Sequence, residues 1–177
     1  MRDVDRKPRT APAFPALADV VRASDGILDL LPIATFICDV RGTILQYNRQ
    51  ATELWGRVPA PGQTHEEFTK GAHFWEPDGT PVKRSLLAQV LSSGKPVRNV
   101  ERLVERADGT RFAISVNIDP LFDPAGNVIG AIHCIQDVTD RKRAVDALEQ
   151  SRQHAREQEQ RLAATYEHAA IGISEMA

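Results

Sequence analysis

The sequence has little cysteine and no long apolar run, and both absences restrict where the protein can work. Only Cys38 and Cys134 occur among 177 residues, with neither metal-ligand spacing nor the pattern of a disulfide framework. No apolar run approaches the ~20 residues that span a bilayer. Residues 2–9 are largely charged, where a signal peptide would be apolar. We therefore expect a cytoplasmic protein in a reducing compartment, with no membrane insertion.

The sequence also lacks an excess of either charge and the motifs of common enzymes. Lysine and arginine total 22, against 24 aspartate and glutamate residues, which leaves no basic footprint for nucleic acid. There is no glycine-rich phosphate loop and no recognisable Ser-His-Asp constellation. His65 and His73 have no third ligand at suitable spacing, so no metal site is predicted. We expect no catalytic activity in these residues and no nucleic-acid partner.

Proline and glycine divide the chain into segments. Residues 1–16 are basic, contain repeated prolines and have few large apolar side chains, which is typical of a disordered segment. The apolar positions from residue 17 to residue 31 have the spacing of a short amphipathic helix. Further helices are predicted at residues 49–55, where Asn48 is a good N-cap, and at residues 82–91.

Five β-favouring segments predict an antiparallel sheet. They occupy residues 34–38, 43–47, 97–106, 111–118 and 128–136. Two strands come first, then helices, then three strands in hairpin succession. This order predicts an α+β fold, with a five-stranded antiparallel sheet and helices on one face. In the fourth strand, period-two alternation assigns Phe112, Ile114, Val116 and Ile118 to the core.

A charged segment follows Asp140 and predicts a long helix. Leu148, Ala155, Leu162 and Ala169 recur every seven residues, whereas the second column of this heptad is mixed. The alternatives are a solvated single helix and a dimeric coiled coil, of which we favour the coiled coil. A homodimer through the N-terminal helix, the outer sheet face and this helix would also cover Ile132 and Cys134.

The joint between the last strand and this helix resembles a known signature. An apolar run ends at Asp137-Val138-Thr139, and Thr139 or Asp140 can cap the helix that follows. This arrangement resembles the Asp-Ile/Val-Thr motif that closes PAS domains of bacterial signalling proteins. The resemblance implies a PAS domain with its N-terminal helix at residues 17–140 and a signalling helix at residues 141–165. Residues 166–177 resemble the truncated start of a second PAS domain, because residues 166–173 echo residues 30–36.

The resemblance to PAS domains also implies that the core face of the sheet bends around a ligand cavity. Counting back from Asp137, alternation places Ile135, His133 and Ala131 on the cavity face. The same counting turns Phe36 and Cys38 inward and Cys134 outward, which argues against a disulfide. His133 would then either donate a hydrogen bond to a ligand or be satisfied within a partly filled core.

Arg102 is a further candidate for the cavity lining. Strict alternation with Val100 and Val104 would point its guanidinium inward, where it must be paired or bind an anion. We favour the alternative that a bulge, or snorkelling of the long side chain, carries the guanidinium to the rim.

The resemblance further implies a signalling role for the joint at Asp137 and Thr139. In related PAS domains the corresponding Asp commonly pairs with a basic residue near the start of the helix or at a neighbouring strand turn. Arg41, Arg141 and Lys142 are the available partners in this sequence.

We therefore predict a cytoplasmic PAS sensor module of a multidomain signal transducer. By family resemblance, its output domain in the same chain would be a sensor histidine kinase or a cyclic-dinucleotide enzyme. An unidentified small molecule or partner would bias the sheet, and the joint would pass that bias to the helix. One alternative is a PAS module that dimerises and relays without any ligand.

A second alternative is a haem or flavin sensor that uses His133, His65 or His73. We disfavour both cofactors. The reactive Asn-Cys-Arg-Phe-Leu-Gln motif of the flavin-binding PAS branch is missing, and no histidine lies in the helix at residues 82–91, where a haem-binding PAS domain would be expected to offer one.

Overall fold

The computed structural model describes residues 17, 21 and 26–174. The chain divides into two compact units, Met1–Asp137 and Val138–Ala177. The elements in chain order are η1 (Leu28–Leu30), β1 (Ala34–Asp39), β2 (Ile44–Tyr47), α2 (Arg49–Trp55), α3 (His65–Phe68), β3 (His73–Trp75), α4 (Leu86–Ser93), β4 (Val97–Glu105), β5 (Arg111–Phe122), β6 (Val128–Asp137) and α5 (Thr139–Ser174). The predicted α+β class is confirmed, since an antiparallel sheet and helices make up the first unit.

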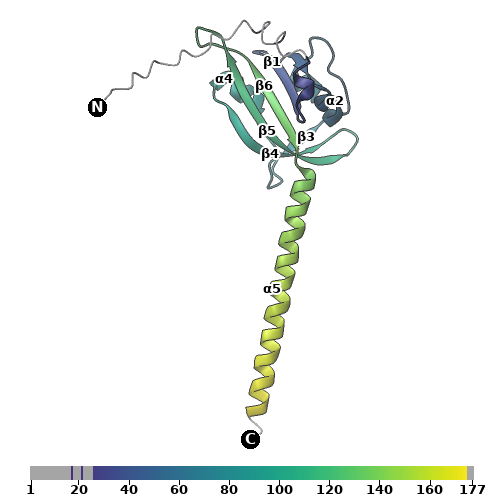
Figure 1. The fold of residues 1–177 in the computed structure, drawn as a ribbon, viewed down its shortest axis with the longest axis vertical. Coiled ribbons are helices and arrows are strands. Elements are labelled where there is room, and N and C mark those ends of the chain that lie inside the picture. The colour runs from purple at the N-terminus through teal and green to yellow at the C-terminus, as the bar shows by residue number, and fades with distance from the viewer. Residues whose placement is uncertain (1–16, 18–20, 22–25, 175–177) are drawn as a thin grey trace, which may run out of the picture. The chain divides into compact units, whose positions relative to one another are not determined.

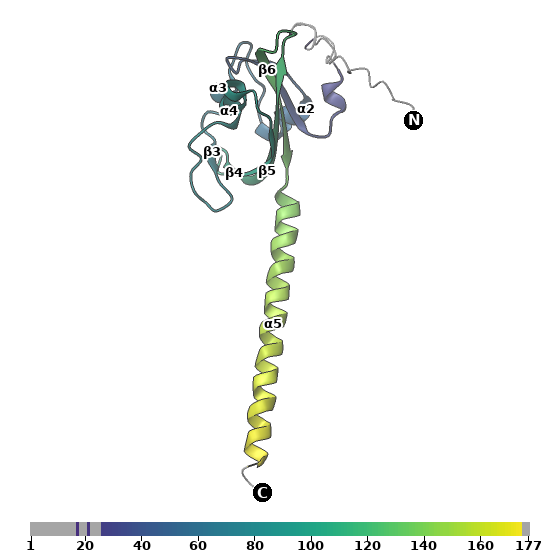
Figure 2. The same cartoon turned by 90° about the vertical axis from the view of Figure 1, so that its left-hand side faces the viewer.

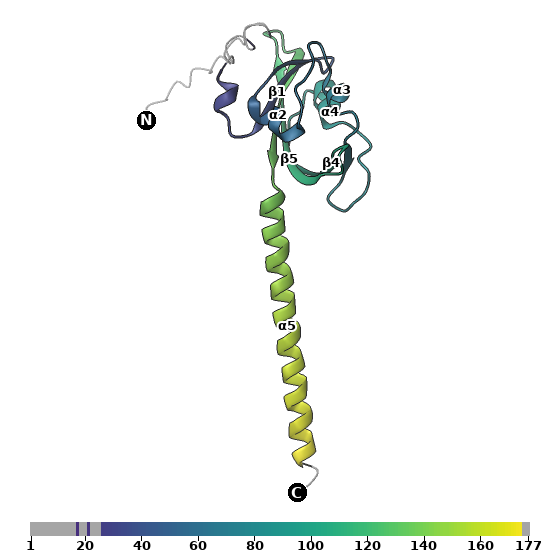
Figure 3. The same cartoon turned by 90° about the vertical axis from the view of Figure 1, so that its right-hand side faces the viewer.

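One antiparallel sheet forms the frame of the first unit (Figure 1). Its strands lie in the order β2-β1-β6-β5-β4-β3, so that the chain-distant strands β1 and β6 are neighbours. In their register, Phe36 lies opposite His133, and Cys38 lies opposite Ala131. Figures 2 and 3 show α3 and α4 on the same side of the sheet. The inward orientation predicted for Phe36 and Cys38 on β1 and for Ala131, His133 and Ile135 on β6 is confirmed, since all five are buried.

The core lies between this side of the sheet and the helices. The inward residues predicted on β5, from Phe112 to Ile118 in steps of two, are all buried. They form one apolar cluster with buried residues of α2, α3 and α4, among them Trp55, Phe68 and Val90. Burial of a large apolar side chain stabilises the folded state by about 1.5–3 kcal/mol. These contacts therefore hold the three helices on the inner face.

Asn48 connects three elements at one edge of the sheet. Its Oδ1 accepts hydrogen bonds from the amides of Ala51 in α2 (3.0 Å) and Thr35 in β1 (2.9 Å). Its Nδ2 donates to the carbonyls of Leu28 (2.9 Å) and Ile33 (2.7 Å). The predicted capping role of Asn48 is confirmed. The same side chain also uses its full hydrogen-bonding capacity to fix η1 and β1 against α2.

The structure has a sixth strand between the helices predicted at residues 49–55 and 82–91, where no strand was predicted. This strand, β3, pairs with β4 and places Phe74 opposite Val104. A strand of three residues is too short for period-two alternation to reveal. The sheet is therefore six-stranded, where five strands were predicted.

Two predicted helices differ from those observed. α4 begins at Leu86 rather than at residue 82, because Ser85 is its N-cap and its hydroxyl accepts from the Ala88 amide (3.3 Å). Part of the helix predicted at residues 17–31, namely residues 18–20 and 22–25, lies outside the described residues; Leu17 and Val21 are helical, and the last part is the short 3-10 helix η1. The segment predicted to be disordered, residues 1–16, also lies outside them.

The second unit consists of α5, which contains 36 residues. Its apolar residues Val145 and Leu148 are 47% and 52% exposed. α5 continues through Ser174, so the segment expected to enter a second PAS strand is helical. A strand needs neighbours to pair with, and the described residues after Tyr166 form only helix. None of the helices in the described part of the chain combines the length and apolar character needed to cross a membrane.

Candidate ligand cavity

A cavity of about 680 Å³ lies on the inner face of the sheet. Such a volume is typical of sites for small organic molecules. Its sheet wall consists of Arg102 on β4, Ile114 and Val116 on β5, and His133 and Ile135 on β6. The facing wall comes from α2, α3, β3 and residues 81–87. The cavity is therefore bounded by strands that are central to the sheet and by the segment that leads into α4.

An aromatic cluster in the core adjoins this cavity through Trp55, which is part of the lining. Trp55 packs edge-on against Phe68 and Phe112, with ring centroids 6.2 Å apart in both pairs. Phe36 packs edge-on against Phe68 at 5.7 Å. The indole Nε1 of Trp55 is buried without a hydrogen-bond partner, although buried indole N–H groups usually have one. Trp55 thus connects a close-packed aromatic cluster to the cavity lining and carries one unpaired donor.

Two histidines lie ring to ring in the cavity. The centroids of His65 on α3 and His133 on β6 are 4.9 Å apart. Burial lowers the pKa of His65 to about 4. Burial, and to a smaller degree the neighbouring His65, hold the pKa of His133 well below its usual range. Both imidazoles are therefore neutral near pH 7, and each has one N–H donor and one acceptor nitrogen.

Arg102 points into the cavity. The prediction that a bulge or snorkelling carries its guanidinium to the rim is therefore wrong. A bulge is present in β4, where Asn99 has a φ of 49°. It lies before Arg102, and the register beyond it pairs Arg102 with the inward Ile114. The guanidinium Nη1 lies 2.6 Å from the Glu76 carboxylate and donates to the Glu101 carbonyl at 2.8 Å. The guanidinium charge is thus offset by a neighbouring carboxylate rather than by solvent.

Unpartnered polar atoms are concentrated in the cavity lining. Seven buried side-chain nitrogen and oxygen atoms of the described residues lack a hydrogen-bond partner within the chain. Five of them belong to the lining residues Trp55, His65, Arg102 and His133. Folded proteins pair the large majority of such atoms. Their accumulation at one place indicates a site that is completed by something other than this chain.

Cationic side chains dominate the charged part of the lining. Lys70, Lys83 and Arg84 are exposed, and Arg102 lies deeper. Glu66 is the one carboxylate among the lining residues in the described part of the chain. A concave site with charges of one sign raises the local concentration of ions of the opposite sign. The cavity is therefore electrostatically suited to an anion.

The predicted cavity residues separate into two groups. His133, Ile135 and Arg102 line the cavity. Ala131, Cys38 and Phe36 are fully buried within the adjoining core rather than in the lining. Burial, with a smaller contribution from the neighbouring Asp39 carboxylate, raises the pKa of the Cys38 thiol to about 12.

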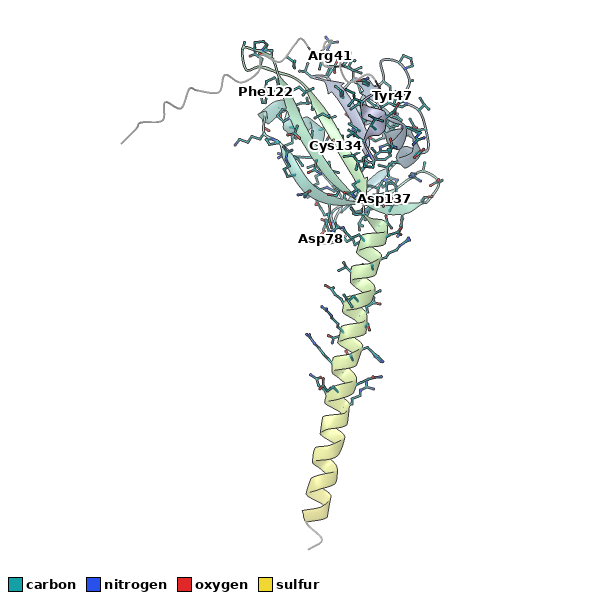
Figure 4. The ribbon with its side chains drawn as sticks, viewed as in Figure 1. Arg41, Tyr47, Asp78, Phe122, Cys134 and Asp137 are labelled. Carbon is teal, nitrogen blue, oxygen red and sulfur yellow. The ribbon has the colours of Figure 1, made fainter. Side chains whose placement is uncertain are left out.

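The other cysteine, Cys134, lies near the middle of the sheet on its outer face (Figure 4). Its side chain is half-buried, and burial raises the pKa of its thiol. The two cysteines therefore occupy opposite faces.

The pairing of His65 with His133 was missed from the sequence, which related His65 to His73. His73 is exposed, and its ring lies 5.9 Å from that of Trp75. The spacing Thr64-x-x-Glu67 carries the missing signal, because it forms a capping box that begins α3 at His65. No group of three histidine, cysteine or acidic side chains within the described ranges is arranged to hold a metal ion.

Asp137 and Arg41 lie at opposite ends of the sheet (Figure 4). Asp39, two residues before Arg41, pairs with Gly130, whereas Asp137 ends the same strand. With a rise of about 3.3 Å per residue, these two points on β6 are roughly 20 Å apart. Arg41 as the partner of Asp137 is therefore wrong.

Comparison with known proteins identifies the family. The family model described as the PAS fold matches residues 28–143, which is most of the chain. The chain therefore belongs to the PAS fold family. Domains of this family are sensory modules of signalling proteins and are not themselves catalytic. A search of curated proteins finds no match.

Several solved structures are similar to this chain. An RNA-binding light-oxygen-voltage receptor is 23% identical, with a TM-score of 0.55; the alignment covers 84% of this chain and 41% of that receptor. A PAS domain from Colwellia psychrerythraea is 16% identical, with a TM-score of 0.48, and 69% of this chain and 99% of that one are covered. The PAS domain of Bordetella pertussis BvgS is 17% identical over 76% of this chain and 99% of that one, with a TM-score of 0.48. At 23% identity, the likeness to the light-oxygen-voltage receptor concerns the fold alone.

Proposed function

We propose that this chain is the sensor module of a larger signal transducer and that its cavity binds a small organic molecule. The unpartnered polar atoms of Trp55, His65, Arg102 and His133 are the observation that carries this proposal. A buried polar atom without a partner destabilises the folded state by about 1–3 kcal/mol. A ligand that bonds to these atoms would remove part of this penalty.

The composition of the cavity supports a ligand with an apolar body and few polar groups. Ile114, Val116 and Ile135 offer an apolar wall along three adjacent positions of the sheet. The neutral imidazoles of His65 and His133 can each donate or accept one hydrogen bond. Sites for small molecules combine these two features: apolar area supplies affinity, and a few polar groups fix orientation.

The alternative of a PAS module that only dimerises requires a filled interior. Phe36, Phe112 and Trp55 are the large side chains that would fill it. They pack together with Phe68 in the core, and a cavity of about 680 Å³, which Trp55 also lines, stays open. Empty cavities in proteins are usually apolar, whereas this one is lined by histidine and arginine. We therefore favour the ligand-binding function.

Native mass spectrometry of the freshly purified chain tests this proposal. We expect a small-molecule adduct on the wild-type protein, reduced by His133→Leu and retained by Cys134→Ser. The two residues are adjacent on β6 and lie on opposite faces, so the second variant is a matched control. The proposal fails when the wild-type protein carries no adduct and no compound of a diverse small-molecule library raises its melting temperature. A visible absorption band on the purified protein would instead support the haem or flavin alternative.

We further propose that α5 is the signalling helix and that two copies of it form a coiled coil in a homodimer. Val145 and Leu148 leave apolar surface uncovered on this helix. Isolated helices derive little stability from propensity alone, and an apolar seam supplies the missing packing. Leu148→Glu should shift the chain toward monomer in sedimentation velocity. Gln150→Glu should not, because Gln150, two residues after Leu148, lies outside the apolar column of the heptad. Equal behaviour of both variants would refute the coiled coil.

We also propose that this module precedes an output domain, such as a histidine kinase or a cyclic-dinucleotide enzyme, in the cytoplasm. We assign residues 17–140 to the sensor, residues 141–165 to the signalling helix and residues 166–177 to the start of a second PAS domain. A single residue, Val138, connects the end of β6 to the start of α5, so a short joint would carry the signal. In the intact signalling protein, Asp137→Ala should change the response of the output to the ligand. An unchanged response would reject the role of the joint.

A further inference from the structure

We propose that the cavity selects a small organic carboxylate, that Arg102 binds its carboxylate group, and that the Glu76 side chain holds this position in the unliganded protein. Glu76 would then act as an internal competitor, displaced when the ligand binds. This inference rests on the proposed ligand-binding function and names the chemical class of the ligand.

The environment of Arg102 indicates an anion site. Its side chain is only 12% exposed and lies on the inner face of β4, opposite Ile114. Its Nη1 contacts the Glu76 carboxylate and the Glu101 carbonyl, whereas its Nε is buried without a partner. A guanidinium binds carboxylates best through two parallel N–H bonds. Arg102 therefore keeps unused capacity for a second, better-placed carboxylate.

Glu76 is placed so that its side chain can leave without disturbing the fold. It lies at the start of a tight turn, in which its amide donates to the Thr80 carbonyl (2.8 Å) and its carbonyl accepts from the Gly79 amide (2.9 Å). These bonds hold the backbone and do not involve the carboxylate. The Glu76 side chain is 37% exposed, so its carboxylate can be solvated after release. Because water can solvate the released Glu76 carboxylate, a ligand carboxylate can replace it on Arg102.

The rest of the lining favours an anion attached to an apolar body. Four cationic side chains face the cavity or its mouth, namely Lys70, Lys83, Arg84 and Arg102. Because His65 and His133 are neutral near pH 7, they offer a ligand hydrogen bonds without a net charge. Ile114, Val116 and Ile135 supply apolar contact beyond the anion. A free inorganic anion would leave this apolar wall uncovered, whereas an organic carboxylate would use both parts.

Isothermal titration of the intact chain with matched acids and amides tests the proposal. Phenylacetate and hexanoate are the probes, and phenylacetamide and hexanamide are their uncharged counterparts. Each acid should bind at least about tenfold more tightly than its amide, as expected for a hydrogen bond to a charged group. Phenyl phosphate distinguishes the type of anion and should bind less tightly than phenylacetate.

Two variants distinguish the role of Arg102, which binds the ligand carboxylate, from that of Glu76, which competes with it. Arg102→Met should weaken phenylacetate binding by about 10- to 100-fold, because it removes charged hydrogen bonds. Glu76→Gln should strengthen binding by about two- to fivefold, because the competing carboxylate is gone. Arg98 and Asp119 provide the matched control, since they form an ion pair on β4 and β5 outside the lining. Arg98→Met and Asp119→Asn should leave binding unchanged.

Several outcomes would overturn the inference. These are equal affinity for acid and amide, tighter binding of phenyl phosphate, equal losses in Arg102→Met and Arg98→Met, no gain in Glu76→Gln, or no binding of any probe. Arg102→Lys, which keeps the charge and loses the planar fork, should bind phenylacetate weakly and remain folded by circular dichroism. A purified wild-type protein that carries an adduct, and keeps it in Arg102→Met, would refute the carboxylate site while leaving the proposed sensor function intact.

Discussion

The two faces of the sheet differ in how they accommodate polar side chains. On the outer face, the Asn117 side chain accepts a hydrogen bond from the Asn99 amide (2.9 Å), and Asp119 pairs with Arg98. On the inner face, neither ring nitrogen of His133 has a partner within the chain. Polar residues on the two faces of the sheet therefore experience opposite conditions. The outer face satisfies its polar groups from its own strands, whereas the inner face leaves them available to a ligand.

This difference separates a binding site from an ordinary core. A core built only for stability would have apolar side chains at these inward positions, because unpaired buried polar atoms destabilise it. Natural proteins accept such penalties mainly at functional sites. The inner face therefore combines a stabilising part around Phe36, Phe68 and Trp55 with a functional part around His65, His133 and Arg102.

Truncation of an inner aromatic residue should have the largest effect on stability. Phe36 is fully buried against Phe68 and His65, so Phe36→Ala should lower the free energy of unfolding by about 3–5 kcal/mol. Ile132 is the half-buried outer-face neighbour of His133. Ile132→Ala should therefore lower the free energy of unfolding by only about 1 kcal/mol. Urea unfolding followed by circular dichroism measures both values. Similar losses in the two variants would mean that the faces do not differ in packing.

Acid should destabilise the protein through its inner-face histidines. Unfolded histidine has a pKa near 6.5, whereas the folded pKa of His65 is about 4 and that of His133 is also lowered. The unfolded chain therefore binds more protons between these values, and stability falls as the pH drops below about 6.5. Between pH 7 and pH 5 the loss should be about 2 kcal/mol for His65 alone.

The pH dependence can be assigned by comparing two variants. The double variant His65→Leu/His133→Leu should lose most of the decrease in unfolding free energy between pH 7 and pH 5. His73→Leu, which removes an exposed histidine near the mouth, should retain it. If the decrease is the same in both variants, other groups cause it.

Sequence reasoning recovered the parts of the fold that depend on local patterns. Alternation along β5 and β6 correctly predicted that Phe112, Ile114 and His133 point inward. Asn48, a favourable N-cap residue, correctly predicted the start of α2. These features depend on a residue and its near neighbours in the chain. Strand β3 was not predicted, because three residues show no periodicity and the strand pairs with β4, which is distant in the sequence.

Prediction of the candidate site from the sequence requires more non-local information than prediction of the fold. Whether Arg102 points inward depends on where the β4 bulge falls, and the bulge at Asn99 precedes it. Its partner Glu76 and the ring neighbour of His133, His65, come from segments whose path the sequence does not specify. An open cavity is likewise a property of packing among many side chains, and no motif encodes it.

The two cysteines should respond differently to the same substitution. Cys38 is fully buried in the apolar core beside Ala131, so Cys38→Ser would bury a hydroxyl and should lower stability by about 1–3 kcal/mol. Cys134→Ser should change stability by less than about 0.5 kcal/mol, because the site is half-exposed and near the Thr35 hydroxyl. Urea unfolding of the two single variants measures the difference. A larger loss in Cys134→Ser would contradict the assignment of faces.

Replacement of His133 should have a modest effect on stability, with the opposite sign to the losses expected at Phe36 and Cys38. His133→Leu removes two unpartnered ring nitrogens from a residue that is only 5% exposed, and leucine has a similar volume. The free energy of unfolding of the ligand-free protein at pH 7 should therefore rise by about 1 kcal/mol. The same variant should lose the ligand adduct, so that stability increases while binding decreases. A decrease in both quantities would mean that His133 supports the fold, and the distinction between the two faces would then lose its functional meaning.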